Sequence, residues 1–431
     1  MMKLRLFALS AALVASLGTI ANAAEYLMIP DSSSTTGRRI MLFSPVDGSL
    51  VNPAYINLNA LTGASTPKHA LQVKGEIWVS DQVADRVDIF TLGGTYLRTI
   101  SGGLDNIRGM GFANNTVYVT NDGAANGAVA DTVVMYDTAG TFLGRFSVSP
   151  ATSPFGVYDH NGELLVTDST EHTIRRYTYA GVSLGVFHSG AIRFPEQIHK
   201  RVANDNLIVT GFSTPSGVYE LTPAGAQVNF FFSGSGARGA YELTNGNFIY
   251  TLGTGAYVGP YGGTHPGTLV HGANAQFVDK LVIPEISGTV TLSDFVGDVS
   301  LQTATLTFSP TDNSGDYVKV VTLGPSGEYS FNADMGPGSY SVKAKSSHWL
   351  AKSAGVVTIG SVNTGLNFVL TNGDCDDDNE VGIGDYSILS AAYNTSVGDP
   401  GFVPAADLNG DDSVDIGDYA ILSANYGLSG D

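Results

Sequence analysis

A short strand-like motif recurs along the first two thirds of the chain at nearly regular intervals. The six copies are YLMIPD from Tyr26, IWVSDQ from Ile77, VYVTND from Val117, LLVTDS from Leu164, LIVTGF from Leu207 and FIYTLG from Phe248. After the first interval, successive copies lie 40, 47, 43 and 41 residues apart. Because a period of about 40 to 50 residues built from strands is the size of one four-stranded blade, the spacing predicts a β-propeller.

Residues 153–187 show the internal order of one repeat. The strand FGVYD leads through a turn at Asn161-Gly162 to LLVTD, and TIRRYTY leads through a turn at Ala180-Gly181 to VSLGVF. Apolar runs joined by such turns form an antiparallel meander. The repeats resemble the NHL-type six-bladed β-propellers over residues 25–285. In such a ring, the strand FVDKLVIP from Phe277 would pair with the strand near Tyr26, which would hide both sheet edges.

The residues that lead into the innermost strand of each blade are the candidates for a ligand funnel. They are Lys68-His69, Arg108, Phe155, Glu196-Gln197 and Arg238, of which we select His69, Arg108, Glu196 and Arg238. Their charges would suit an anionic or sugar-like ligand. The alternative is that they pair with one another across the funnel.

The sequence contains no HExxH, GxSxG, P-loop or Cys-His motif, and the catalytic residues of any activity remain unknown. A lactonase-type metal site could use Glu25 or Glu196 with Asp81, Asp122 or Asp168. These aspartates follow strand ends, where aspartate commonly bonds its own backbone turn. The chain is therefore not assigned to an enzyme class.

Residues 286–370 carry strand-like runs without the blade motif. The runs are SGTVTLSDF, QTATLTF, YVKVVTLG, GEYSFNAD, GSYSVKAK, GVVTIG and GLNFVL. They predict an antiparallel β-sandwich and resemble the carboxypeptidase-regulatory sandwiches. Its expected role is that of a spacer, and the alternative is carbohydrate binding through Trp349 and Tyr340.

Two twelve-residue acidic segments near the end of the chain share one pattern: DCDDDNEVGIGD from Asp374 and DLNGDDSVDIGD from Asp407. Ca²⁺ binds six to eight hard oxygens at about 2.3–2.6 Å, and a short loop supplies them from alternate positions. Positions 1, 3, 5, 7 and 12 predict the ligands of two calcium ions. They are Asp374, Asp376, Asp378, Glu380 and Asp385 in the first loop, and Asp407, Asn409, Asp411, Ser413 and Asp418 in the second, with Glu380 and Ser413 acting through backbone carbonyls.

Further positions of the two loops also agree. Position 6 holds Asn379 and Asp412, residue types that adopt left-handed backbone most readily after glycine. Position 8 is Val381 and Val414, as expected if the two loops pair over a small core. A short apolar segment with helical spacing follows each loop.

Residues 372–431 resemble a type I dockerin, which has one helix after each loop and aspartate at position 12. The resemblance implies a calcium-folded module that binds a cohesin-like or other surface protein through its helices. Positions 10 and 11 are Ile383-Gly384 and Ile416-Gly417, where cellulosomal dockerins commonly carry small hydroxyl residues. This departure argues against a cellulosomal cohesin as the receptor.

The start of the chain predicts export. Lys3 and Arg5 precede an apolar run, and Ala21-Asn22-Ala23 is a cleavage pattern, so residues 1–23 are expected to be a signal peptide. We expect no membrane span and a secreted or cell-surface protein. The net charge is −19, and no Lys or Arg follows Lys352, which argues against nucleic acid as a partner.

These features combine into a mainly β protein made of a propeller, a sandwich and a small α-helical calcium module. The favoured function is an exported protein that docks through the calcium module and presents its propeller to a protein or glycan. The alternative is a secreted propeller enzyme, a hydrolase or lyase, that acts in polysaccharide breakdown.

Overall fold

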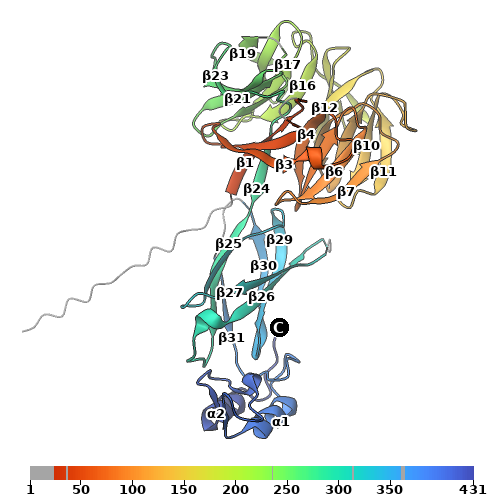
Figure 1. Ribbon diagram of the computed structural model, residues 1–431. Helices are drawn as coiled ribbons and strands as arrows, with labels where there is room; N and C mark the ends of the chain where they lie inside the picture. Colours follow the sequence, from red (N-terminus) through yellow and green to blue (C-terminus); the bar gives the residue numbers. More distant parts are fainter. Residues whose placement is uncertain (1–23, 35–36, 235, 313–314, 361–364) are drawn as a thin grey trace, which may run out of the picture.

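Six four-stranded sheets follow one another around a central axis in the first part of the molecule (Figure 1). The computed structural model describes residues 24–431 apart from 35–36, 235, 313–314 and 361–364. The expected signal peptide, residues 1–23, lies outside the described residues. The predicted mainly β fold class, with its propeller, is confirmed.

Five blades are continuous in sequence, and their strands pair antiparallel in chain order. They are β4 (Pro67–Val73), β5 (Glu76–Asp81), β6 (Arg86–Thr91) and β7 (Tyr96–Ser101); β8 (Ile107–Ala113), β9 (Thr116–Asn121), β10 (Thr132–Asp137) and β11 (Phe142–Ser147); β12 (Pro154–His160), β13 (Glu163–Asp168), β14 (Thr173–Tyr177) and β15 (Ser183–Ser189); β16 (Pro195–Lys200), β17 (Leu207–Gly211), β18 (Ser216–Leu221) and β19 (Gln227–Gly234); and β20 (Gly239–Glu242), β21 (Asn247–Leu252), β22 (Gly255–Pro260) and β23 (Thr268–His271).

The sixth blade joins the two ends of the propeller. Its order is β24 (Asp279–Ile283), β1 (Ala24–Asp31), β2 (Arg39–Phe43) and β3 (Leu50–Asn57). Strand β24 is antiparallel to β1, with Ala24 opposite Ile283 and Met28 opposite Asp279. The ring is therefore closed by the pairing that the sequence predicts.

The recurrent motif forms the second strand of each blade, and it is apolar on both faces because each blade packs between two others. On β5, Ile77 belongs to a core with Met28 of the preceding blade, whereas the adjacent Trp78 belongs to a core with Met110 of the following blade. Strands that are buried on both faces read as continuous apolar runs.

The innermost strands approach one another closely around the axis. A Cβ at Gly109 of β8 would lie 2.7 Å from the carbonyl oxygen of Phe155, and one at Gly156 of β12 would clash with the carbonyl oxygen of Glu196. Glycine at these positions allows the blades to meet at the centre.

The second body is a two-sheet sandwich that lies between the propeller and the helical end of the chain (Figure 1). One sheet has the order β28-β25-β31 and the other the order β27-β26-β29-β30. The strands are β25 (Glu285–Leu292), β26 (Thr303–Pro310), β27 (Tyr317–Thr322), β28 (Glu328–Asn332), β29 (Gly338–Ser346), β30 (Trp349–Ile359) and β31 (Leu366–Leu370).

Two expectations about the sandwich are corrected. Strands β25 and β31 pair in parallel, because the chain returns from the other sheet before it enters β31. Trp349 and Tyr340 are buried in the core between the sheets rather than displayed for sugar stacking. Their polar atoms donate inward, Trp349 Nε1 to the Ser293 carbonyl at 3.1 Å and Tyr340 Oη to the Gly336 carbonyl at 2.6 Å.

The last body contains α1 (Ile383–Ala392) and α2 (Ile416–Asn425), with the short pair β32 (Thr395–Ser396) and β33 (Ser413–Val414). Val381 and Val414 are buried in the same core, as the sequence predicts, and the main-chain bonds of each loop go to a segment outside the two loops. The Val381 amide donates to the Leu428 carbonyl, and the Asn394 amide donates to the Val414 carbonyl. Each loop therefore pairs with the segment that follows the other loop's helix.

Among the described residues, the structure shows no helix that is both long enough and apolar enough to cross a bilayer.

Candidate functional site

The first acidic loop brings its leading carboxylates together. Asp374, Asp376 and Asp378 each offer an oxygen, and these oxygens lie within 4.8 Å of one another. Backbone amides of the loop hold them, since Asp374 Oδ2 accepts from the Asn379 amide at 3.1 Å and Asp378 Oδ1 accepts from the Glu380 amide at 2.9 Å. Asp374 Oδ2 also lies 3.1 Å from Lys345 Nζ of the sandwich. The loop thus holds the carboxylates with backbone bonds and directs them to a common centre.

One carboxylate oxygen in this loop is buried and accepts no hydrogen bond from the described part of the chain. Asp374 is 1 % exposed, and its Oδ1 atom has no hydrogen-bond partner among the described residues. Burial raises the pKa of Asp374, and this effect outweighs the opposing contributions of Lys345 and the Asn379 amide. A buried acceptor with no donor is costly, and a bound cation would remove that cost. The residues therefore fit calcium, which prefers carboxylate oxygens.

The aspartate at position 12 has the same environment in both loops. Asp385 Oδ1 accepts from the amides of Cys375 and Asp376 at 2.5 and 3.1 Å. Asp418 Oδ1 accepts from those of Leu408 and Asn409 at 2.7 and 3.1 Å. Each carboxylate therefore ties the start of its loop to the first turn of the following helix.

The second loop repeats the geometry with one less carboxylate. Asp407 accepts backbone amides through both oxygens, and the Asn409 amide group donates to Asp411 Oδ2 at 2.9 Å. Ser413, at position 7, lies in β33. Position 6 has the predicted left-handed backbone in both loops, with φ of 69° at Asn379 and 71° at Asp412. The two loops therefore share the left-handed residue at position 6.

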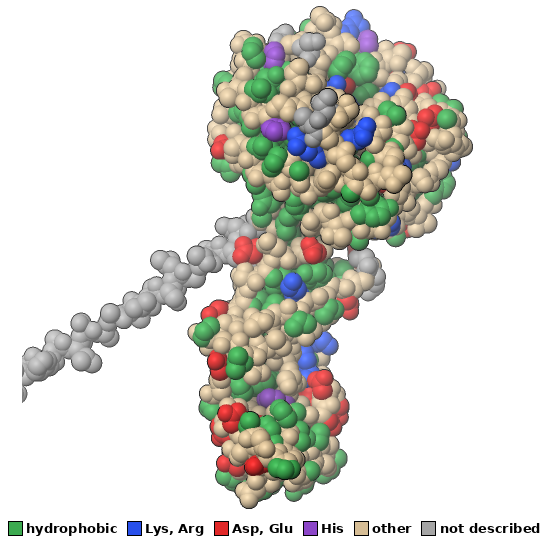
Figure 2. Space-filling view, in the orientation of Figure 1, with side chains coloured by type: hydrophobic (Ala, Val, Ile, Leu, Met, Phe, Trp, Pro, Cys, Tyr) green, Lys and Arg blue, Asp and Glu red, His purple; other side chains and the backbone are tan. Residues whose placement is uncertain are grey.

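The two helices display matching apolar side chains. Ile383 and Ile416 are 69 % and 65 % exposed, and Tyr386 and Tyr419 are each 41 % exposed with ring centroids 6.3 Å apart. A groove of about 330 Å³ lies between them, lined by Tyr386, Leu389, Ser390, Tyr393, Ile416 and Tyr419. Figure 2 shows acidic and hydrophobic side chains side by side over this end of the molecule.

The predicted funnel residues of the propeller come together at the axis, where they bond one another or nearby side chains. Lys68 Nζ lies 2.9 Å from Glu196 Oε2, and both side chains are almost fully buried. Arg108 lies 2.8 Å from Asp122 Oδ2, and Arg238 bonds the Asn274 side chain. These contacts form a layer of polar bonds between the strand starts at the axis, and two of the three are ion pairs.

The rings of Phe155 and Phe277 support this layer. Lys68 Nζ lies 4.7 Å from the centroid of Phe155 and 4.8 Å from that of Phe277. Burial lowers the pKa of Lys68 to about 8 and raises the pKa of Glu196. Two charges are thus held in an apolar setting by their mutual attraction and by cation–π contacts.

The aspartates considered for a lactonase-type site serve the turns or bond Arg108. Asp81 accepts the amides of Ser65 and Thr66 at 2.6 and 2.8 Å, and Asp168 accepts the amide of Thr170 at 2.8 Å. Asp122 is occupied by Arg108.

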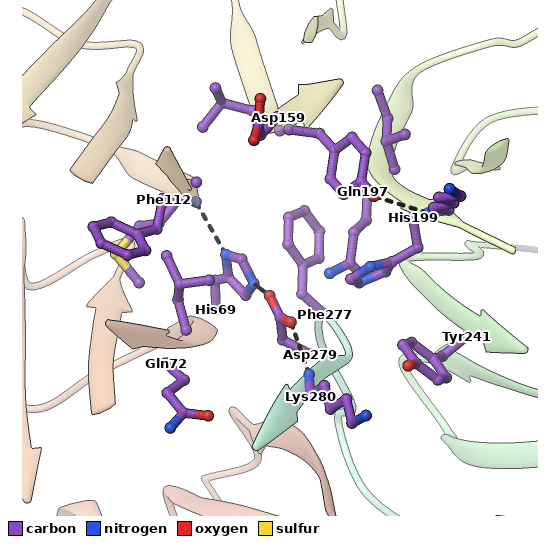
Figure 3. Close-up of a pocket in the computed structure, with 18 residues that line it drawn as sticks. His69, Gln72, Phe112, Asp159, Gln197, His199, Tyr241, Phe277, Asp279 and Lys280 are labelled. Atoms are coloured by element: carbon purple, nitrogen blue, oxygen red, sulfur yellow. Dashed lines mark hydrogen bonds and ion pairs between the residues drawn. The ribbon is translucent and has the colours of Figure 1, made fainter. Parts of the chain in front are cut away.

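His69 differs from the other three selected funnel residues because it lines a cavity (Figure 3), and they do not. The cavity has a volume of about 390 Å³, and all six innermost strands contribute to its wall. The residues used below are His69, Tyr158, Asp159, His199, Tyr241 and Asp279. Sequence reasoning missed all of these except His69, because it considered only the starts of the innermost strands. Because side chains alternate between the two faces of a strand, the later residues of each innermost strand could also have been identified from the sequence as candidates.

Comparisons with known proteins show remote similarity. No family model and no curated protein matches the chain. A chain of a nidogen/laminin complex aligns at 13% identity and a TM-score of 0.48, over 60% of this chain and 98% of that one. A protein of unknown function from Bacteroides caccae aligns at 14% and 0.43, over 61% and 99%. A chain of a type II cohesin–X–dockerin complex from Acetivibrio cellulolyticus aligns at 20% and 0.29, over 34% and 97%.

Proposed function

We propose that the protein is exported, binds two calcium ions in its C-terminal module, and docks through that module to a surface protein of the cohesin type. The observation that carries the proposal is the first acidic loop, in which three carboxylates converge beside a buried, unpartnered oxygen of Asp374. The propeller is then the part that is presented to a protein or glycan.

Calcium would be held by Asp374, Asp376, Asp378 and Asp385 in the first loop, and by Asp407, Asn409, Asp411 and Asp418 in the second. When bound, the ion neutralises the repulsion among these carboxylates. The Asp385 and Asp418 bonds connect each loop to its helix, so an ordered loop fixes the helix that follows.

The docking surface is the pair of matching helix faces. Ile383 and Tyr386 on α1 correspond to Ile416 and Tyr419 on α2, and all four are exposed. Since isoleucine occupies the position where cellulosomal modules carry hydroxyl residues, the partner should offer an apolar pocket rather than hydrogen-bonding groups.

Calorimetric titration of residues 24–431 tests the metal sites. Two calcium ions are expected for the unaltered chain and one each for Asp374→Ala and Asp407→Ala. Asp399→Ala is the matched control, because Asp399 caps the Ser396 amide outside both loops. Unchanged stoichiometry in the two loop variants would remove the calcium assignment.

Binding to a panel of recombinant cohesin domains, with and without calcium, tests the docking step. Calcium-dependent binding to at least one domain is expected, with loss in the double variant Tyr386→Ala/Tyr419→Ala and two calcium ions still bound. Failure of every domain would exclude a cohesin-type partner, and equal binding by the double variant would exclude this surface.

Export is tested by sequencing the N-terminus of the protein recovered outside a cell that expresses the whole chain. The product should begin at Ala24. Retention of the full-length chain inside the cell would contradict the proposal.

A further inference from the structure

The lining of the propeller cavity holds equal numbers of carboxylates and lysines. Two carboxylates line it, Asp279 and Asp159, together with two lysines, Lys200 and Lys280. The lysines have carboxylate partners outside the lining, since Lys200 Nζ lies 2.6 Å from Asp205 and Lys280 Nζ lies 2.8 Å from Glu25. Their charges are therefore largely neutralised before a ligand arrives.

The histidines do not neutralise the carboxylates. His69 Nδ1 accepts the Met110 amide hydrogen at 3.0 Å, so its proton is on Nε2, which lies 3.0 Å from Asp279 Oδ2. His199 Nε2 donates to the Val278 carbonyl at 2.5 Å, and burial lowers the pKa of His199. The Met110 bond thus leaves His69 with a single ring proton on Nε2, burial disfavours the charged form of His199, and the negative charge of Asp279 remains.

Aromatic rings form much of the wall. Tyr158, His199 and Tyr241 stand edge to face in a row, with centroid separations of 6.0 and 5.5 Å. On the other side, the rings of His69 and Phe277 are 5.3 Å apart. Burial raises the pKa of both Tyr158 and Tyr241 to about 12, and the Asp279 charge adds to the effect at Tyr241. Both phenols are therefore neutral.

We propose that this cavity binds a small organic cation with an ammonium group, held between the Tyr158–Tyr241 wall and Asp279. Aromatic faces attract a desolvated ammonium ion, and a nearby carboxylate supplies the opposite charge. Figure 3 shows Asp279 beside His69 near the middle of the view, with His199 and Tyr241 to the right and Asp159 at the top. The proposal is independent of the calcium module.

The assignment reverses the ligand charge suggested by the sequence. Arg108, Arg238 and Lys68 indicated an anion, but none of them lines the cavity. Lys68 meets Glu196, Arg108 meets Asp122, and Arg238 bonds Asn274. The open cavity carries acceptors instead. A metal ion is a poorer occupant, because both nitrogens of His69 already have partners.

The test is calorimetric titration of residues 24–431 with choline, alongside its neutral isostere 3,3-dimethyl-1-butanol and the primary amine n-butylamine. Choline is expected to bind at least about tenfold more tightly than the neutral alcohol. Equal binding of choline and the neutral alcohol would show an apolar cavity and overturn the proposal. Failure of both choline and n-butylamine to bind at millimolar concentration would also overturn it. The n-butylamine titration tells whether the site accepts a primary or only a methylated ammonium group.

Two variants locate the site. Asp279→Asn and Tyr241→Leu are each expected to weaken choline binding at least about tenfold, whereas Asp47→Asn removes a carboxylate from a distant surface turn and should not. If Asp279→Asn fails to fold, Asp159→Asn at the rim provides the same charge change with a smaller effect. Unaltered affinity in Tyr241→Leu and in the folded carboxylate variant would overturn the proposal.

Discussion

Lys68 and Glu196 are a buried ion pair, and removing one partner leaves the other charge without compensation. Glu196→Gln is expected to destabilise the propeller by about 3–5 kcal/mol. The double variant Lys68→Met/Glu196→Gln should recover much of that loss, since it removes both charges. Calorimetric unfolding of the propeller transition measures both effects.

The exposed pair Lys200–Asp205 provides the comparison. Lys200→Met should cost no more than about 1 kcal/mol, because water screens charges at the surface. If Glu196→Gln also lost no more than about 1 kcal/mol of unfolding free energy, the central pair would not be buried in solution.

His199 should make the propeller sensitive to acid. Burial lowers its folded-state pKa below the ordinary value of about 6.5. As the pH falls below that value, the unfolded chain takes up a proton that the folded chain does not, so the free energy of unfolding decreases. This decrease continues until the depressed folded-state pKa is reached. Urea unfolding between pH 5 and pH 8 should show a flatter pH dependence in His199→Gln, and identical slopes would contradict the assignment.

At the scale of the element, the close approach of the innermost strands limits what they tolerate. Gly156→Ala places a methyl group against the Glu196 carbonyl, with an expected cost of about 1–3 kcal/mol. Gly272→Ala is a suitable control, because a Cβ at Gly272 meets nothing within 4 Å. Thermal unfolding compares the two, and equal stability would show that the strands can separate at no cost.

Elements with a strong local pattern could be predicted from the sequence, whereas contacts between sheets could not. The second strand of each blade was found because burial on both faces makes it a continuous apolar run. The parallel neighbours β25 and β31 were missed, since nothing local distinguishes a parallel edge from an antiparallel one. Trp349 was weighed as a sugar-stacking residue, although the sandwich core buries it completely.

In the candidate sites, too, local backbone features could be predicted from the sequence and long-range contacts could not. The left-handed backbone of Asn379 and Asp412 follows from loop spacing alone. The partners of Arg108 and Glu196 depend on which strand ends meet at the axis, and Asp279 becomes a cavity residue only when β24 returns to the first strand of the chain. Such long-range contacts are not encoded in any short segment.

At the scale of the whole molecule, the sandwich and the C-terminal helical module share a core. Leu350 of β30 packs among the buried residues of the module, and Lys345 Nζ lies 3.1 Å from Asp374 Oδ2. Calcium should therefore raise the unfolding temperature of the sandwich as well as that of the module. At a hundredfold excess over the dissociation constant, the linkage gives about 2.7 kcal/mol per site.

Scanning calorimetry with calcium or a chelator measures this coupling. Leu350→Ala should reduce the calcium-dependent shift of the sandwich transition, whereas Val356→Ala, at an exposed position of the same strand, should not. If the temperature of the sandwich transition in the unaltered chain does not change with calcium, the two parts unfold independently.

The pairing of β1 with β24 also governs the order of events during synthesis. Strand β1 is made first, yet its partner emerges only after roughly 250 further residues, so the sixth blade waits for the rest of the ring. Until then the edge of β1 is free to pair with another chain, and closing so long a loop is slow. A chain that stalls before Asp279 would therefore be left with an open, aggregation-prone ring, and a holding chaperone would protect it most during that interval.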